Sequence, residues 1–148
     1  MTKGSLQVEA PDVMVERLAQ ATNARDVDAI VDCFAPDYRN ETPLHPSRGF
    51  VGRDQVRRNW EQILAHVPNL RATVVRRVVS GDTVWSEWEM RGTRRDGAAH
   101  LMRGVIIFEV RDRRAASARF YLEPAEDTGE NASEAVSHIV APTTGSAS

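Results

Sequence analysis

The segment Asp82-Thr83-Val84-Trp85-Ser86-Glu87-Trp88-Glu89-Met90-Arg91-Gly92 (residues 82–92) decides the fold that this sequence predicts. Side chains alternate between the two faces of a β-sheet, so the two tryptophans point to opposite faces. One face is apolar apart from a hydroxyl and carries Val84, Ser86, Trp88 and Met90. The other is mainly charged and carries Trp85, Glu87, Glu89 and Arg91. The segment therefore predicts a long strand whose apolar face covers a core.

The flanking sequence extends this strand into an antiparallel sheet. Turn signals at Ser80-Gly81-Asp82 and Asp96-Gly97 separate four predicted strands, over 70–79, 83–94, 99–110 and 115–123. Earlier in the chain, apolar spacing predicts helices starting near Asp12 and Asp26, the second stopped by Pro36. A short strand over 37–42, a loop over 43–52 and a third helix over 54–66 follow. This order predicts an α+β fold.

We expect one domain over residues 11–124, with a flexible leader over 1–10 and a polar tail over 125–148. The tail is rich in small and acidic residues, which is typical of disorder. Within it, Asn131-x-x-Glu134 matches a capping box, so a short helix is the alternative.

Composition argues against several classes of protein. The 148 residues are 41% hydrophobic and 27% charged, with a net charge of −2, and a nucleic-acid or membrane-surface protein would usually carry a basic excess. The sequence shows no targeting segment and no membrane-spanning run, so we expect a cytoplasmic protein. Cys33 is the single cysteine and reads as a buried core residue. Histidines lack metal-ligand spacing, so we expect neither a metal nor a cofactor.

Three motifs resemble a known group of proteins. They are Phe34-x-Pro36-Asp37-Tyr38, Gly49-x-x-Gly52-Arg53-Asp54 and Arg119-Phe120-Tyr121-Leu122-Glu123-Pro124. Together with the order of elements, they look like the nuclear transport factor 2-like superfamily, in its SnoaL-like polyketide-cyclase branch. The resemblance implies a cone-shaped fold, with a curved, mostly antiparallel sheet wrapped around three helices. It also implies a pocket on the concave face, a homodimer through the convex face, and no metal.

A comparison with limonene-epoxide-hydrolase-like members narrows the chemistry. Tyr38-Arg39-Asn40 resembles their Tyr-x-Asn element, which helps to hold a water. Their Arg-x-Asp pair falls on Trp88 and Met90, and their last aspartate falls on Phe120. All three positions are apolar, so there is no carboxylate to activate water. The resemblance thus supports the fold and argues against epoxide hydrolysis.

Two registers of the sheet remain open from the sequence. In the favoured one, Trp88 and Met90 face inward and Glu87 and Glu89 face outward. An outer patch then forms a homodimer interface and consists of Trp85, Val105, Ile107 and Tyr121. In the other register, the inward side chains include possible acid/base groups and are Glu87, Glu89, Arg103 and Glu123.

The candidate site follows from the favoured register. Tyr38, Asn40 and His45 are the candidate catalytic residues, at the polar end and the mouth of the pocket; His45 could instead be an exposed loop residue. The candidate substrate-binding residues are Trp60, Trp88, Met90, Met102, Phe108, Phe120 and Glu123. The two tryptophans could instead be plain core. We expect the protein to bind an apolar small molecule and to catalyse isomerisation, cyclisation or a related acid/base step. A non-catalytic carrier or sensor, or a protein-interaction module, is the alternative.

Overall fold

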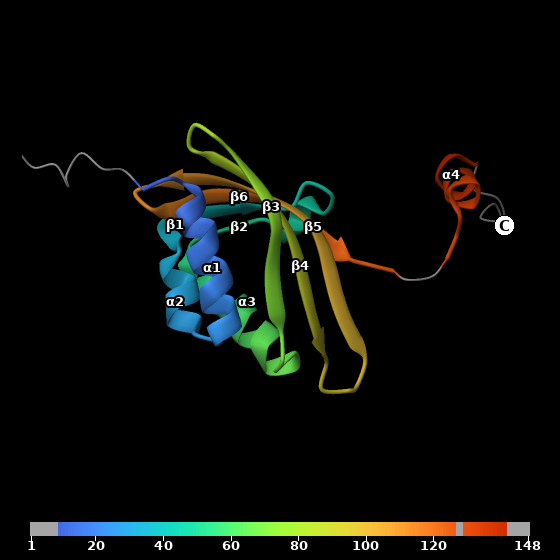
Figure 1. Cartoon of the computed structure of the whole chain (residues 1–148), viewed down its shortest axis with the longest axis horizontal. Helices are drawn as coiled ribbons and strands as arrows, with labels where there is room; N and C mark the ends of the chain where they lie inside the picture. The colour runs from blue at the N-terminus through green and yellow to red at the C-terminus, as the bar shows by residue number, and fades with distance from the viewer. Residues whose placement is uncertain (1–8, 127–128, 142–148) are drawn as a thin grey trace, which may run out of the picture.

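A computed structural model describes residues 9–126 and 129–141. One six-stranded sheet, in the order β2-β1-β6-β5-β4-β3, curves around three helices (Figure 1). All neighbouring strands are antiparallel except β1 and β6, which are parallel. The strands are β1 (Phe34–Glu41), β2 (Phe50–Val51), β3 (Arg71–Ser80), β4 (Thr83–Thr93), β5 (Ala99–Arg111) and β6 (Arg114–Pro124). The predicted α+β cone, with its mostly antiparallel sheet, is confirmed.

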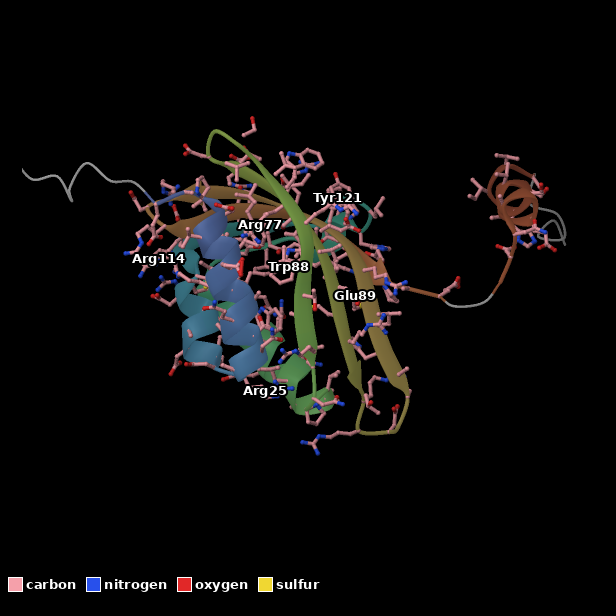
Figure 2. All side chains as sticks on the ribbon, viewed as in Figure 1. Arg25, Arg77, Trp88, Glu89, Arg114 and Tyr121 are labelled. Atoms are coloured by element: carbon pink, nitrogen blue, oxygen red, sulfur yellow. The ribbon has the colours of Figure 1, made fainter. Side chains whose placement is uncertain are left out.

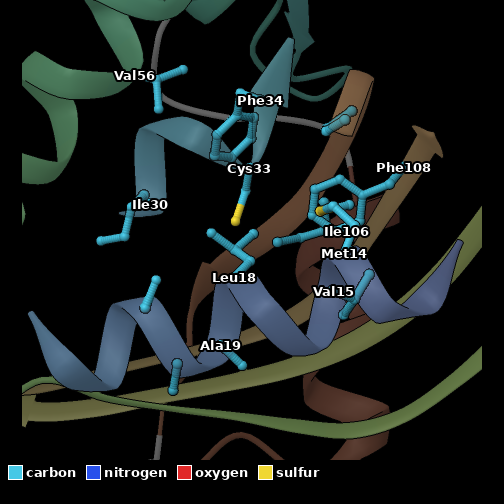
Figure 3. Packing of buried hydrophobic residues seen from close by; sticks show 14 of the residues in the cluster. Met14, Val15, Leu18, Ala19, Ile30, Cys33, Phe34, Val56, Ile106 and Phe108 are labelled. Carbon is cyan, nitrogen blue, oxygen red and sulfur yellow. The ribbon is translucent and has the colours of Figure 1, made fainter. Parts of the chain in front are cut away.

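The three helices fill the concave side of the sheet. They are α1 (Asp12–Ala24), α2 (Val27–Asp32) and α3 (Arg53–His66). Met14 and Leu18 of α1 are buried against the sheet, where Ile106 and Phe108 lie (Figure 3). The Asn23 side chain ties the end of α1 to β3, because its Oδ1 accepts from the backbone N of Ala72 at 2.7 Å and its Nδ2 donates to the backbone O of Ala72 at 2.9 Å.

Burial along the strands identifies the register. On β4, Val84, Ser86 and Trp88 are almost fully buried, whereas Trp85 is 53% exposed. The neighbouring β5 and β6 agree, with the buried Ile106, Phe108 and Ala118 on the same face. The register with Trp88 and Met90 inside is therefore correct. The alternative with Glu87 and Glu89 inside is wrong, because both alternate with the buried side chains of β4 and so belong to its outer face. Figure 2 labels Trp88 and Glu89 on this strand.

The chain between α2 and α3 differs from the sequence-based expectation. The second helix ends at Asp32, and β1 already begins at Phe34, which pairs with Ala115 of β6. Pro36 lies inside β1, within the interval where the register between β1 and β6 shifts. A proline fits there because it cannot donate a ladder hydrogen bond. The loop over 43–52 also contains β2, whose two residues are too few to give an alternating pattern.

The tail contains a helix, α4 (Ala132–Val140), that begins with the capping box seen in the sequence. Asn131 Oδ1 accepts from the backbone N of Glu134, and Glu134 Oε1 accepts from the backbone N of Asn131, both at 3.0 Å. Most of the expected leader, and residues 127–128 and 142–148 of the tail, lie outside the described residues. The domain limits stay a prediction. No helix in the described ranges is long and apolar enough to cross a membrane.

Candidate functional site

A cavity of about 390 Å³ lies between α3 and the concave face of the sheet. We call it the cone cavity. It is lined by Phe34, Tyr38, Asn40, Thr42, Arg48, Phe50, Val56, Asn59, Trp60, Ile63, Met90, His100, Met102, Phe120, Leu122 and Glu123. Another hollow, of about 440 Å³, lies around β2 and the end of β1, with Arg39 and Arg119 on its wall. The cone cavity is the better ligand site, because its wall is apolar with a few polar groups.

The first polar group is a hydrogen-bonded chain on β1. The Tyr38 hydroxyl donates to Asn40 Oδ1 at 2.8 Å, and Asn40 Nδ2 donates to Thr42 Oγ1 at 3.4 Å. All three residues are at least nine-tenths buried. Burial raises the pKa of the Tyr38 phenol well above its ordinary value, so the phenol stays protonated at neutral pH. Within the described residues, the Thr42 hydroxyl accepts this bond and has no acceptor for its own hydrogen, and Thr42 is on the cavity wall.

The second polar group lies at the rim. Glu123, at the end of β6, is one-third exposed and belongs to the cavity wall. Its carboxylate oxygens lie 3.5 Å from His45 Nε2 and 3.9 Å from Arg48 Nη1. Arg48 also lines the cavity, whereas His45 contacts it only through Glu123. The mouth thus combines one carboxylate with an imidazole and a guanidinium.

The expected substrate-binding residues divide into two sets. Trp60, Met90, Met102, Phe120 and Glu123 line the cone cavity; that they bind a substrate stays a prediction.

Trp88 and Phe108 belong to the core instead, which corrects their expected place on the wall. The Trp88 indole donates from Nε1 to Ser86 Oγ at 2.8 Å, and Ser86 Oγ donates to the backbone O of Ile106 at 2.7 Å. Phe108 is fully buried and lies near Met14 of α1 (Figure 3). Strand alternation gives the face of a residue but not its depth below the surface of the cavity.

Four polar wall residues were missed from the sequence: Thr42, Arg48, Asn59 and His100. Two of them carried a signal. Thr42 continues the spacing of Tyr38 and Asn40, two residues further along the same face. His100 shares the face of Met102 by the same alternation, but its place beside a hairpin suggested exposure. Arg48 and Asn59 carried no such signal.

No group of three or more His, Cys, Asp or Glu side chains that could hold a metal ion occurs in residues 9–126 and 129–141. Cys33 is buried, and burial raises the pKa of its thiol, which leaves the thiol protonated at neutral pH. Its sulfur points toward Leu18 in the core (Figure 3), as expected for a core residue.

A curved sheet wrapped around three helices, with a cavity on its concave side, defines a protein of the nuclear transport factor 2-like superfamily. Within it, the model of the SnoaL-like domain matches residues 15–118, so the chain belongs to the SnoaL-like family. A search of curated proteins found no match.

Solved structures share this fold. IdmH from Streptomyces antibioticus, described as a candidate polyketide cyclase, is 23% identical, with a TM-score of 0.67 over 77% of this chain and 92% of that one. A loop-truncation variant of IdmH is 25% identical, with a TM-score of 0.64 over 76% and 91%. An LEH-like epoxide hydrolase of M. tuberculosis is 18% identical, with a TM-score of 0.65 over 76% and 82%.

Proposed function

We propose that this SnoaL-like protein binds an apolar small molecule in the cone cavity and moves a proton on it, in an isomerisation or cyclisation step. The observation that carries this proposal is an apolar wall interrupted by a few polar groups, which is typical of small-molecule sites. The volume of about 390 Å³ lies near the lower end of the usual range, so we expect a compact ligand.

The polar groups suggest a division of roles. Because Tyr38 stays protonated, it cannot act as a base, and it serves with Asn40 to orient the Thr42 hydroxyl. Thr42 then donates to an oxygen atom of the ligand. Glu123 takes up or returns the proton at the rim, and His45 lies close enough to relay it.

Trp60 provides the assay, because it is the one tryptophan on the described wall of the cavity. We would screen apolar carbonyl and polyene compounds by tryptophan fluorescence and analyse the mixtures for product by mass spectrometry.

Thr42→Val should weaken binding about twofold to tenfold, the effect of one hydrogen bond. Glu123→Gln should keep binding and lose turnover. Trp85→Phe, on the outer face, is the matched control and should change neither. Turnover unchanged in Glu123→Gln would exclude the proposed proton transfer.

A non-catalytic carrier is the second candidate. The apolar character of Trp88 and Met90 favours it, because the related hydrolases keep a charged pair at these positions. Glu123 also already faces two basic side chains at the rim. A carrier would show stabilisation by a ligand without product, and Glu123→Gln would then have no catalytic effect to measure.

We also propose a homodimer through the convex face of the sheet. Val78 and Trp85 pair across β3 and β4 and are 65% and 53% exposed, and Ile107 lies next to Trp85 on β5. Two ion pairs flank the apolar patch of Val78, Trp85 and Ile107. They join Arg76 to Glu87 at 2.9 Å and Arg103 to Glu89 at 2.8 Å. An exposed apolar patch with a charged border is typical of an interface. A cytoplasmic location without a nucleic-acid or membrane partner stays a prediction.

A further inference from the structure

His100 lies on the wall of the cone cavity, at the start of β5. Its ring makes no hydrogen bond within the described ranges. Burial lowers its pKa, and the nearby positive charge of Arg94 acts in the same direction, so the imidazole is neutral at pH 7. A neutral imidazole offers one donor and one acceptor nitrogen. His66 of α3 and Arg94 line an adjoining hollow with His100, and Asn59 lines both.

The register of the sheet separates His100 from the polar chain on β1. Glu41, the residue before Thr42, is aligned through Arg119 of β6 with Ile107 of β5. His100 lies seven residues before Ile107 on that strand, or about 23 Å of extended chain, which the curvature of the sheet shortens. The wall between these ends is mostly apolar and includes Met90, Met102 and Phe120, with Glu123, aligned with Arg103 of β5, at its rim. The cavity therefore has a polar group at each of two ends.

Asn59 of α3 completes the end of the cavity at His100. Its Oδ1 accepts from Gln55 Nε2 at 2.7 Å, and its amide hydrogens meet no acceptor in the part of the chain that the structure describes. A neutral imidazole and an amide donor suit an uncharged oxygen function, such as a hydroxyl or a carbonyl. Glu123, the carboxylate on the described wall, lies on β6 and is engaged at the rim by His45 and Arg48.

We propose that the cone cavity selects an elongated apolar molecule with an uncharged oxygen function at each end, and that His100 binds the second of these oxygens. This inference rests on the proposed ligand site and deepens it. It predicts a dependence on the second oxygen that a purely apolar pocket would lack, because a hydroxyl buried without a partner disfavours binding.

The test uses unbranched α,ω-diols of about eight to fourteen carbons, which suit a cavity of about 390 Å³. Each diol is compared with the 1-alkanol of the same length. These probes do not absorb where tryptophan does, so Trp60 fluorescence can report binding. We expect one diol length to bind about threefold to tenfold tighter than its alkanol. His100→Leu should reduce that ratio to one or below, and His100→Gln, which keeps a donor and an acceptor, should retain part of it. His138→Leu, in α4, is the matched control and should keep the full ratio.

Each outcome separates the two proposals. If diols and alkanols both bind with equal affinity, or if His100→Leu keeps the preference, the role of His100 is wrong while the apolar ligand site stands. If neither series binds, the proposed ligand site is overturned for this size class, and this inference with it. If His100→Leu does not fold, nitrogen NMR of the wild-type His100 ring decides. The favoured diol must shift its signals and the alkanol must not, and equal shifts would overturn the proposal.

Discussion

Replacing Ser86 by alanine should destabilise the fold strongly for so small a change. Ser86 Oγ accepts from Trp88 Nε1 at 2.8 Å and donates to the backbone O of Ile106 at 2.7 Å, and both side chains are at least 99% buried. The alanine leaves the indole N–H buried without a partner. An unsatisfied buried donor costs about 1–3 kcal/mol, so we expect Ser86→Ala to lower the free energy of unfolding by about 2 kcal/mol. For a domain of this length, that lowers the Tm by about 4–8 °C.

A double-mutant cycle isolates the hydrogen bond from other effects of the substitution. Trp88→Phe removes the indole donor, so the same Ser86→Ala change made in that background no longer strands it. Its cost should then fall to about 0.5–1.5 kcal/mol, the value of the remaining bond to Ile106. The difference between the two backgrounds is the coupling energy, which we expect to be about 1 kcal/mol.

Urea unfolding followed by circular dichroism measures all four proteins of the cycle. The denaturant slopes must agree, since a change in slope would report a change in the unfolded state. A cost of Ser86→Ala below about 0.5 kcal/mol, or equal costs in both backgrounds, would refute the proposed role of the serine. Probe binding should be unchanged in Ser86→Ala once the folded fraction is corrected, because Ser86 is not on the cavity wall.

Three further changes test other parts of the fold and the interface. Gly104 has φ +152°, and an added Cβ would meet the backbone O of Tyr121 at 2.0 Å. Gly104→Ala should therefore lower the free energy of unfolding in urea by about 3 kcal/mol or more, and a decrease below about 1 kcal/mol would contradict this. Arg113 has φ +69° in the tight β5–β6 turn, a conformation that favours glycine, so Arg113→Gly should raise the Tm by a few degrees. A lower Tm would show that the ion pair of Arg113 with Glu9 stabilises the fold more than the glycine does. Trp85→Glu should convert the proposed dimer into a monomer in light scattering, and a monomeric wild type would refute the interface.

The lowered pKa of His100 gives a pH dependence of stability with a definite sign. The unfolded chain binds the proton more tightly than the folded chain does. The contribution of His100 to the free energy of unfolding is therefore present above the ordinary histidine pKa of 6.5 and is lost as the pH falls below it. His100→Gln should therefore lose less stability than the wild type on acidification through this range. Chemical unfolding at a series of pH values measures the difference, and parallel curves would contradict the shift.

The face of each central strand was predictable because three neighbouring strands carry consistent patterns. A shift by one residue would expose Trp88 and Phe108 together, which no compensating change on the outer face could balance. The depth of these residues was not predictable. Trp88 donates a hydrogen bond to Ser86, and Ser86 donates to the Ile106 carbonyl on the next strand. This carbonyl becomes a partner of Ser86 only when β4 and β5 are paired.

The polar part of the site was only partly predictable, and position in the chain explains why. Tyr38 and Asn40 lie in a strand, where spacing gives direction, and they do share the cavity wall. His45 lies in a loop, where spacing gives no direction, and it contacts Glu123 rather than the cavity.

The distribution of polar groups limits the chemistry that the cavity can support. Its middle is lined by Met90, Met102 and Phe120, where a developing charge would find no hydrogen-bond donor. Charge must therefore develop near one of the polar groups, and Tyr38 can stabilise it only as part of a neutral donor chain. Two wall residues near these groups can act as a base: Glu123, to which the proton transfer is assigned above, and His100, on a different strand. Turnover that is lost in Glu123→Gln but kept in His100→Gln would identify the carboxylate as the base, whereas the reverse result would identify the imidazole.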